Sequence, residues 1–466
     1  GTNPDAEGRY AIFLANNEAP VTLRNFTLEV SAWDGSDKTP EEAVNTWNCA
    51  GLTLEKVEIK GKADYAVHSV NSKMDAQTSL ISCRIEGAFG ESAVAFHDNS
   101  EGNAAATPSV TGSCIINTDV DGSAMYDINS SGAFLMNNAL SAEGTTVRLG
   151  CSDAVVQNNS IEGDISLASE GILLNTLIAL NEADIMRADG SARNTVVLMN
   201  SLESIELDGG NGVTLAQNSV SGNMSAQKVD YLLMQDNTVG GEISTAGSTN
   251  AYGDDLFDPS ARAEAGVNED LLPKPNKEVF AGMDYKTDVR TENDVKKLKS
   301  YLNAAARNQT YAIIPPGLYS TEAISLAGVE NFDLYAYGVA VEFDSAEWTV
   351  FSMNGCKDVS VYGLSITHKT HANGQGTVIE KGDDYVIVQS DPGYFPDLTD
   401  SDNIETTSPF IEAFRPGETV PYADIGFKSM EYLGGGKHKC VFGTDRSQEL
   451  EVGGKITMRG KGSGNV

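Results

Sequence analysis

The chain has 466 residues, with abundant glycine (46), sparse proline (14) and only 7% aromatic residues. This length exceeds one ordinary domain and is sufficient to bury a sizeable core. The 66 acidic against 32 basic residues give a formal net charge of −34, which argues against nucleic acid or an anionic membrane surface as the main partner.

A short phrase of alternating apolar and polar residues returns through the first 151 residues, at 11–16, 43–48, 66–71, 93–99, 124–129 and 146–151. Each phrase is followed by a second strand-like run, such as residues 21–26 and 52–57. Short apolar runs separated by Asn, Gly and Ser are typical of strands joined by tight turns. The units are about thirty residues long at first and shorten towards twenty, so the early units carry longer loops, where ligand grooves are often built.

A second form of the repeat occupies residues 155–241, with related phrases at 156–161, 198–202, 215–220 and 234–239. The apolar residues that close the units stand at positions 161, 183, 202, 220 and 239. Periods near twenty residues indicate a solenoid. Neither an amphipathic helix nor the spaced leucines of a leucine-rich repeat fit between the phrases. The sequence therefore predicts an all-β fold, a right-handed parallel β-helix over residues 1–245, because one coil alone cannot bury its inward side chains.

Several columns of this β-helix follow from the alignment. We expect a stacked asparagine column at a turn, because asparagine amides can bond from coil to coil and tolerate left-handed backbone; its members are Asn16, Asn48, Asn71, Asn99 and Asn129. The predicted interior residues are Phe26, Val57, Ile85, Ile115, Leu140, Ile161, Leu202, Val220 and Val239. The cysteines at 49, 83, 114, 151, 356 and 440 have no metal-type spacing. We interpret them as buried small hydrophobes, with a disulfide between stacked coils as the alternative.

A mixed aromatic and charged stripe aligns three positions before the asparagine column. It comprises Phe13, Asn45, His68, Ala95 or Phe96, Tyr126 and Arg148, with His97, Asp98 and Asp127 beside it. Aromatic faces stack on sugar rings and charged groups bind sugar hydroxyls, so the stripe indicates an oligosaccharide or polysaccharide partner. A solvated face with some inward aromatics is the alternative interpretation.

A catalytic role is assigned within this stripe. Asp98 and Asp127 are the candidate catalytic pair, because carboxylates on adjacent coils lie about 5 Å apart, as in retaining glycosidases. His68, His97, Tyr126 and Arg148 are the candidate substrate-binding residues. No cofactor and no metal site is expected.

The second half of the chain begins after a linker at 246–283, which lacks periodicity and is rich in Pro, Asp and Ala. Thr291 is a candidate cap for a helix whose apolar face includes Leu298 and Leu302. The run Tyr-Ala-Ile-Ile-Pro-Pro-Gly-Leu-Tyr follows at 311–319, and two coils follow it, ending at Gly338 and Gly363. Residues 371–459 alternate like antiparallel strands, and 460–466 are expected to return to the β-helix.

The helix followed by Ile-Ile-Pro-Pro-Gly-Leu-Tyr resembles the start of pectin-lyase-like β-helix enzymes. Residues 284–466 further resemble the N-terminal part of the β-helix α-1,3-galactosidase family, through Gly-Gln-Gly-Thr-Val at 374–378, Asp-Pro-Gly-Tyr at 391–394 and Gly-Gly-Lys-Ile-Thr-Met-Arg-Gly at 453–460. This resemblance implies a capping helix and first coils at 284–370 and an inserted barrel at 371–459. In that family the catalytic aspartates follow the barrel, on coils that would lie beyond Val466.

Three functions remain open from the sequence. The first is a secreted, periplasmic or cell-surface glycoside hydrolase, galactosidase-like and acting on host or plant glycans. The second is a non-catalytic glycan-binding or adhesion β-helix. The third is a polysaccharide lyase, for which Arg148 is the only candidate base. No membrane-spanning segment is expected, and the sequence does not indicate an oligomeric state.

Overall fold

The structure is a computed structural model, and it describes only part of the chain. The described residues are 10–30, 41–70, 76–97, 107–167, 173–256 except 191 and 252, 302–307, 310–343 except 322, 351–368, 373–390, 410–417, 423–426, 428–443 and 445–459.

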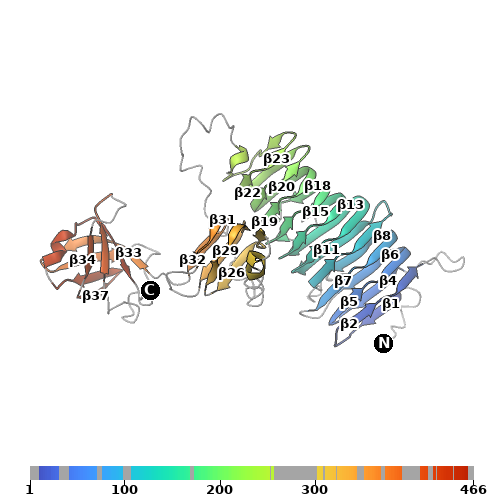
Figure 1. Ribbon diagram of the computed structural model, residues 1–466, viewed down its shortest axis with the longest axis horizontal. Helices are drawn as coiled ribbons and strands as arrows, with labels where there is room; N and C mark the ends of the chain where they lie inside the picture. The colour runs from blue at the N-terminus through green and yellow to red at the C-terminus, as the bar shows by residue number, and fades with distance from the viewer. Residues whose placement is uncertain are drawn as a thin grey trace.

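Residues 10–244 form one continuous parallel β-solenoid of about 11 turns (Figure 1, blue to green). The strand pairs of this sheet among the described residues are parallel, for example β1 with β4 and β20 with β22. The predicted fold class is therefore confirmed. The strands are β1 (Tyr10–Ala15), β2 (Val21–Arg24), β3 (Thr27–Val30), β4 (Glu42–Trp47), β5 (Gly51–Glu55), β6 (Glu58–Val70), β7 (Gln77–Ile81), β8 (Arg84–His97), β9 (Thr107–Thr111), β10 (Cys114–Asn117), β11 (Ser123–Ser131), β12 (Phe134–Met136), β13 (Ala139–Ser152), β14 (Val155–Gln157), β15 (Ser160–Leu167), β16 (Leu173–Leu174), β17 (Leu177–Ala179), β18 (Glu182–Asp189), β19 (Ala192–Leu198), β20 (Ser201–Ala216), β21 (Ser219–Val220), β22 (Met224–Gln235), β23 (Thr238–Val239) and β24 (Ile243–Ser244).

Each coil has three faces, which we number in chain order. Face 1 contains β1, β4 and β11, face 2 contains β2, β5 and β7, and face 3 contains β3 and β10. Long strands such as β6 bend from face 3 of one coil into face 1 of the next, with a register shift between Ala63 and Tyr65. Coils are counted from β1, so that β11 begins coil 5 and the second part of β20 lies in coil 9.

The core consists of columns of identical positions on successive coils. On face 1, five consecutive core positions are fully buried: Val44, Val67, Val94, Met125 and Val147. Burying each such side chain stabilises the fold by about 1.5–3 kcal/mol. On face 3 the corresponding column is Leu28, Ile59, Ile85, Ile115, Leu140 and Ile161.

The predicted interior column is correct in character but wrong in register at its start. Phe26 and Val57 do pack inside, yet the residue of that coil opposite Ile85 is Ile59. Val57 lies two positions earlier, at the turn that Cys83 occupies one coil later. In the early coils both positions are apolar, so hydrophobicity alone cannot distinguish them.

The turn from face 2 to face 3 is nearly the same in every coil. Its first residue has a left-handed backbone, and non-glycine examples are Asn25, Lys56, Ser82, Asn137, Asn158, Leu180, Met199, Gln217 and Asp236. The residue after it points inward. From coil 5 onwards this inward residue is asparagine, and the Nδ2 of each asparagine donates to Oδ1 of the next at 2.9–3.0 Å; the members are Asn138, Asn159, Asn181, Asn200, Asn218 and Asn237. We call this column the asparagine ladder.

Smaller expectations for the first solenoid have mixed outcomes. Asn48 Nδ2 donates to Asn16 Oδ1 at 2.7 Å, as predicted for the turn after face 1. Asn71 and Asn99 lie outside the described residues, and so does the side chain of Asn129. All six cysteines are free, and four of them are buried, in agreement with their interpretation as small hydrophobes. The 3-10 helix η1 (Asp254–Leu256) ends the described part of this solenoid.

A second, smaller parallel solenoid follows (Figure 1, yellow to orange). It begins with a short helical segment at 302–307, whose Leu302 and Ala305 are buried in its core. Thr291 and most of the 246–283 segment lie outside the described residues. The strands of the second solenoid form three parallel sheets. The first contains β25 (Tyr311–Ile313), β28 (Glu330–Tyr335) and β31 (Lys357–Tyr362), and the second contains β26 (Gly317–Thr321), β29 (Val339–Phe343) and β32 (Ser365–His368). The third pairs β27 (Ile324–Ala327) with β30 (Phe351–Asn354).

The third unit is a seven-stranded antiparallel sheet (Figure 1, orange-red). Its own core includes Val386, Val388 and Ile456. The strands are β33 (Asn373–Lys381), β34 (Tyr385–Ser390), β35 (Phe410–Phe414), β36 (Ala423–Gly426), β37 (Ser429–Gly434), β38 (Lys437–Val441) and β39 (Lys455–Arg459), with the 3-10 helix η4 at Asp445–Glu449. The expected return of residues 460–466 to the β-helix stays a prediction, because these residues lie outside the described residues.

Candidate functional site

One outward column runs along face 1 of the first solenoid from end to end. Because successive strand residues point to opposite faces, the positions between the core residues of this face lie on its outside. In register, the column is Phe13, Asn45, His68, Ala95, Tyr126, Arg148, Ser166, Arg187, Glu206, Ser225 and Ser244. We call it the face 1 column. It contains three of the six candidate residues, His68, Tyr126 and Arg148, and continues beyond them.

The early coils of this face carry a buried polar cluster that the stripe alone did not indicate. His68 Nδ1 lies 3.0 Å from Glu42 Oε1, and Asn45 donates from Nδ2 to the other oxygen of Glu42. The ring of Tyr65 stacks on His68 with centroids 4.2 Å apart. Burial raises the pKa of Tyr65 to about 12, and the negative charges of Glu91, Glu42 and Asp64 act in the same direction. Glu42 stands just before the repeated phrase at 43–48, so comparison of the repeated phrases does not identify it as a candidate site residue.

One of the two candidate catalytic aspartates, Asp127, lies in the core and not on the outside of this face. Asp127 pairs in register with Phe96 and Leu149, which are both core residues, and it is fully buried. Ser130 Oγ donates to its Oδ2 at 2.8 Å, and burial raises its pKa to about 7. Asp98 and the side chain of His97 lie outside the described residues. The catalytic assignment of the pair stays a prediction, but Asp127 does not lie on the face for which it was chosen.

The later coils of face 1 contain a groove of about 750 Å³. Arg187 of β18 lies within it, half-exposed, between carboxylates of the preceding and following coils. Its Nε donates to Glu206 Oε2 at 2.9 Å, and its Nη1 donates to Asp164. The bond to Asp164, and that to Glu206, raise the pKa of the guanidinium. Two ion pairs therefore hold the guanidinium in a fixed position.

The other groove-lining groups are mainly hydrogen-bonding. Ser166, Ser225, Asn223 and Gln227 supply hydroxyl and amide groups, and the carboxylates are Asp189, Glu203, Glu206 and Asp208. Asp208 is paired with Lys228 at 2.7 Å. Among the described residues that line the groove, Arg187 is the single cation.

A second hollow of about 500 Å³ adjoins the groove at the corner between faces 3 and 1, and Glu203 lines both. Ala183 pairs with Leu202 and Ile185 pairs with Ser204, so Asp184 lies opposite Glu203 on the neighbouring strand. Strand neighbours are about 4.8 Å apart. Both carboxylates are exposed at the corner and line this hollow.

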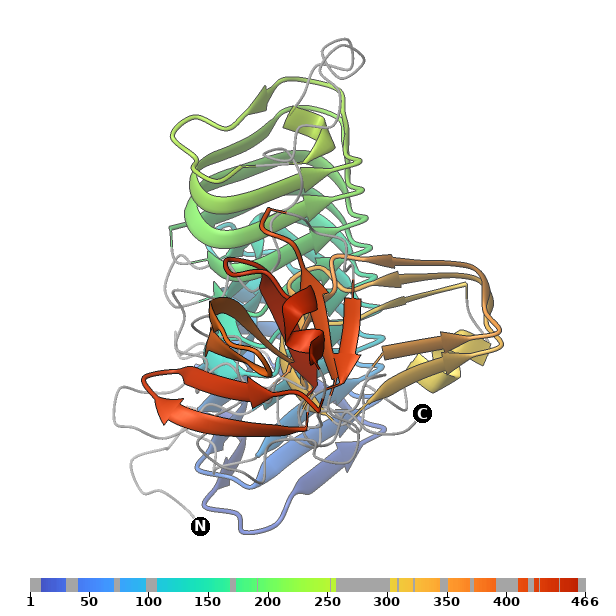
Figure 2. The same cartoon turned by 90° about the vertical axis from the view of Figure 1, so that its left-hand side faces the viewer.

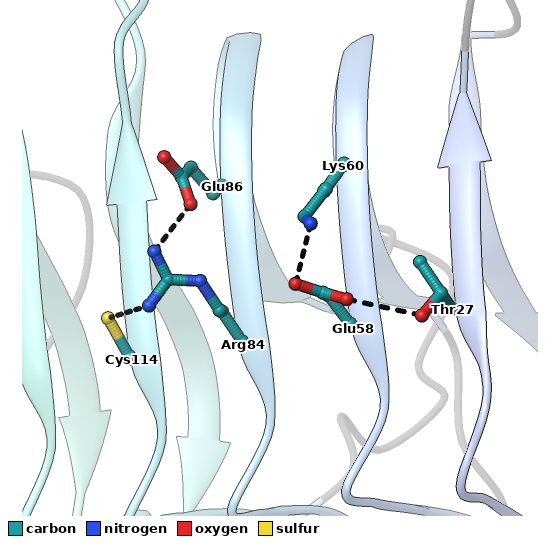
Figure 3. Close-up of polar contacts among 6 residues, drawn as sticks. All are labelled: Thr27, Glu58, Lys60, Arg84, Glu86 and Cys114. Atoms are coloured by element: carbon teal, nitrogen blue, oxygen red, sulfur yellow. Dashed lines mark hydrogen bonds and ion pairs between the residues drawn. The ribbon is translucent and has the colours of Figure 1, made fainter.

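Face 3 of the early coils provides a contrast (Figure 3). There Glu58 pairs with Lys60 at 2.7 Å and accepts from Thr27 Oγ1 at 3.1 Å, and Arg84 pairs with Glu86 at 2.6 Å. These ion pairs resemble those of Arg187, but their residues line neither hollow. Within the described part of the chain, no three His, Cys, Asp or Glu side chains are arranged to hold a metal ion, and no helix is long and apolar enough to cross a membrane.

Comparison with known proteins finds two phage tailspikes among solved structures. The Dettilon tailspike protein (gp208) has a TM-score of 0.25 and 12% identity, over 95% of this chain and 87% of that chain. A mutant tailspike protein of E. coli bacteriophage HK620, solved in complex with a pentasaccharide, has a TM-score of 0.24 and 11% identity over the same shares. No protein-family model and no curated protein matches. The chain is distantly similar to these two structures, and its resemblance to the galactosidase family stays a hypothesis.

Proposed function

We propose that this protein binds an oligosaccharide or polysaccharide along face 1 of the first solenoid, with its principal contacts in the groove around Arg187. The fixed position of this guanidinium is the observation that carries the proposal. Of its five N–H donors, the ion pairs to Asp164 and Glu206 use two. The remaining donors are held ready for ligand oxygens, so little side-chain entropy is lost on binding.

The rest of the face 1 column supports an extended ligand. Its members repeat at each coil, about 4.8 Å apart, and Tyr126 and Arg148 remain partly exposed towards the N-terminal side of the groove. A glycan chain is a repeating ligand whose ring faces are apolar and whose edges carry hydroxyls. The column offers both kinds of contact, with the partly exposed rings of Phe13 and Tyr126 in the early coils and hydroxyl, carboxylate and guanidinium groups in the later coils, whereas Asn45, His68 and Ala95 between them are buried.

The charge of the groove favours an uncharged glycan. Asp189, Glu203 and Asp208 accept hydrogen bonds from sugar hydroxyls, whereas a uronate or sulfate would be repelled by these carboxylates, of which Asp208 is paired with Lys228. At a separation of 6 Å each such repulsion costs about 0.7 kcal/mol in water, and more where solvent is excluded. A few such repulsions outweigh the attraction to one guanidinium that two carboxylates already neutralise.

Glycoside hydrolysis is the finer form of this proposal, in keeping with the galactosidase resemblance of residues 284–466. The observation that favours it is the opposed pair Asp184 and Glu203, on adjacent strands at the edge of the groove. Retaining glycosidases place their two carboxyl groups about 5–5.5 Å apart. In this form, one of the pair donates a proton to the glycosidic oxygen as the glycosidic bond breaks, and the other attacks the anomeric carbon to form a glycosyl ester. The first carboxylate then takes a proton from water, which hydrolyses the ester and restores both groups.

The experiment is a screen of the full chain against neutral, amino, uronate-containing and sulfated glycans, with binding and product release both measured. Arg187→Ala is compared with Arg84→Ala, which removes an arginine from face 3 that is paired with one carboxylate and lines neither hollow. We expect neutral glycans to bind wild type and Arg84→Ala with equal affinity, and Arg187→Ala at least about tenfold more weakly. Asp184→Asn and Glu203→Gln are expected to abolish product release while binding remains. Wild-type affinity in Arg187→Ala would contradict the proposed site.

A further inference from the structure

Face 2 of the first solenoid changes character along its length. One outward column of this face reads, in register, Glu55, Ile81, Thr111, Met136, Gln157, Ala179, Leu198, Ala216 and Gln235. Ile81 in coil 3 is 41% exposed, as expected for an outward side chain, whereas Leu198 in coil 8 is 1% exposed. The same position is therefore uncovered in the early coils and covered in the later ones.

The cover is the second solenoid. Its Ile313, Tyr335 and Tyr337 form one apolar cluster with outward residues of face 2, namely Leu177, Ala179, Val196, Leu198, Ala216 and Leu233. Figures 1 and 2 both show the small solenoid against the side of the large one. We call these six residues of face 2 the docking patch.

Polar contacts fix the register of this contact. Asn194 Nδ2 donates to the carbonyl oxygen of Gly338 at 3.1 Å while also donating to Asn175 Oδ1 at 2.8 Å. Tyr337 Oη lies 3.4 Å from Gln235 Oε1. Gly338 has a left-handed backbone, and a Cβ there would lie 2.7 Å from Asn194 Oδ1. The close approach therefore requires glycine at this position.

The second solenoid has a core of its own, but a small one. Its sheets contain three, three and two strands, and its largest buried cluster is small beside that of the first solenoid. Repeat units bury their hydrophobic faces mainly against neighbouring units, and about three are needed for stability. Its outer tyrosines also stack on one another, with Tyr335 and Tyr362 ring centroids 5.0 Å apart. Exposed to water, this tyrosine face would be an apolar surface without a partner.

We propose that the docking patch is an interaction surface built for the tyrosine-bearing edge of the second solenoid, and that residues 311–362 stay folded only while docked on it. The completed first solenoid thus acts as a template for the second. Because docking uses face 2, it leaves face 1 and its groove open. This inference does not depend on the proposed function.

Hydrogen exchange of the 466-residue chain tests whether the first solenoid keeps the second one folded. Leu198→Asp places a charge in the docking patch, and Ile81→Asp places the same charge in the same outward column where nothing covers it. We expect Leu198→Asp to accelerate amide exchange in β25, β28 and β31 by about 100-fold or more, with β6 to β11 unchanged, and Ile81→Asp to leave both regions unchanged.

A second variant approaches the contact from the other side, so that misfolding of the first solenoid cannot explain the result. Tyr337→Ser removes a docking side chain without altering the first solenoid, and we expect the same acceleration in β25, β28 and β31. Unchanged exchange in these strands in both variants would overturn the proposal. So would equal acceleration in all three variants, because the effect would then not be specific to the docking patch.

Discussion

Asn181 donates from Nδ2 to Oδ1 of Asn200, one coil further along, at 3.0 Å, and donates from the same atom to the carbonyl oxygen of Val156 at 2.9 Å. Its own Oδ1 accepts from both the backbone N–H and the Nδ2 of Asn159. A single buried side chain therefore links three successive coils. The ladder fixes the register of stacked coils as well as contributing energy.

Replacing Asn181 by alanine is expected to destabilise the first solenoid by about 2–4 kcal/mol, because it leaves several buried donors and acceptors unsatisfied at about 1–3 kcal/mol each. Chemical denaturation of the full chain measures this change. The control is Asn158→Gly, which keeps the left-handed backbone but loses only an exposed side-chain bond to Asn137. A loss as small in Asn181→Ala as in the control would argue that the ladder is not structural.

Asp127 predicts a pH dependence of stability. Burial raises its pKa to about 7 in the folded state, above the ordinary value near 3.9 of the unfolded chain. Between these values the folded state holds a proton that the unfolded state has released, so stability falls as pH rises from about 4 to 7. The total loss is about 4 kcal/mol.

The variant Asp127→Asn isolates this effect from the other carboxylates. Its unfolding free energy, measured between about pH 4 and 8, is expected to fall less steeply than that of wild type by the contribution of this one group. Two parallel profiles would show that Asp127 does not titrate in this range.

Gly61 predicts a steric constraint between coils. It has a φ of +122°, and a Cβ there would lie 1.7 Å from the carbonyl oxygen of Val30 in the preceding coil. Gly61→Ala is expected to cost more than about 3 kcal/mol, since both strain and backbone displacement contribute. Gly112→Ala is the matched variant, because its φ is +58° and no atom lies closer than 3.7 Å; about 1 kcal/mol is expected there. Thermal unfolding distinguishes the two, and equal shifts would contradict the close approach.

The repeat predicts the solenoid because an inward apolar residue recurs directly after turn residues in each coil, as at Ile161, Leu202 and Val220, and this recurrence makes the period recognisable in the sequence. Register within a coil was less certain, since Val57 and Ile59 are both apolar and only the stacking distinguishes them. The face 1 column was predicted correctly at His68, Tyr126 and Arg148. Asp127 does not lie on the outside of this face, because it directly follows Tyr126 and successive strand residues point to opposite faces.

The sequence does not predict the groove around Arg187, and the reason is physical. Its residues are dispersed singly over several coils, and each is an ordinary exposed polar residue of its own strand. Only the stacking places Arg187 between Asp164 and Glu206. The sequence does not predict the contact between the two solenoids either. Leu198 lies in an apolar run, Val-Val-Leu at 196–198, which has the same pattern as a strand buried within one solenoid.

The affinity of wild type, Arg187→Ala and Arg84→Ala for the best-binding neutral glycan tests the central claim most directly. The predicted result is a dissociation constant at least about tenfold weaker for Arg187→Ala, equivalent to about 1.4 kcal/mol, with Arg84→Ala equal to wild type. Equal affinity of all three proteins, or equal weakening of both variants, would contradict a glycan site in the groove of face 1.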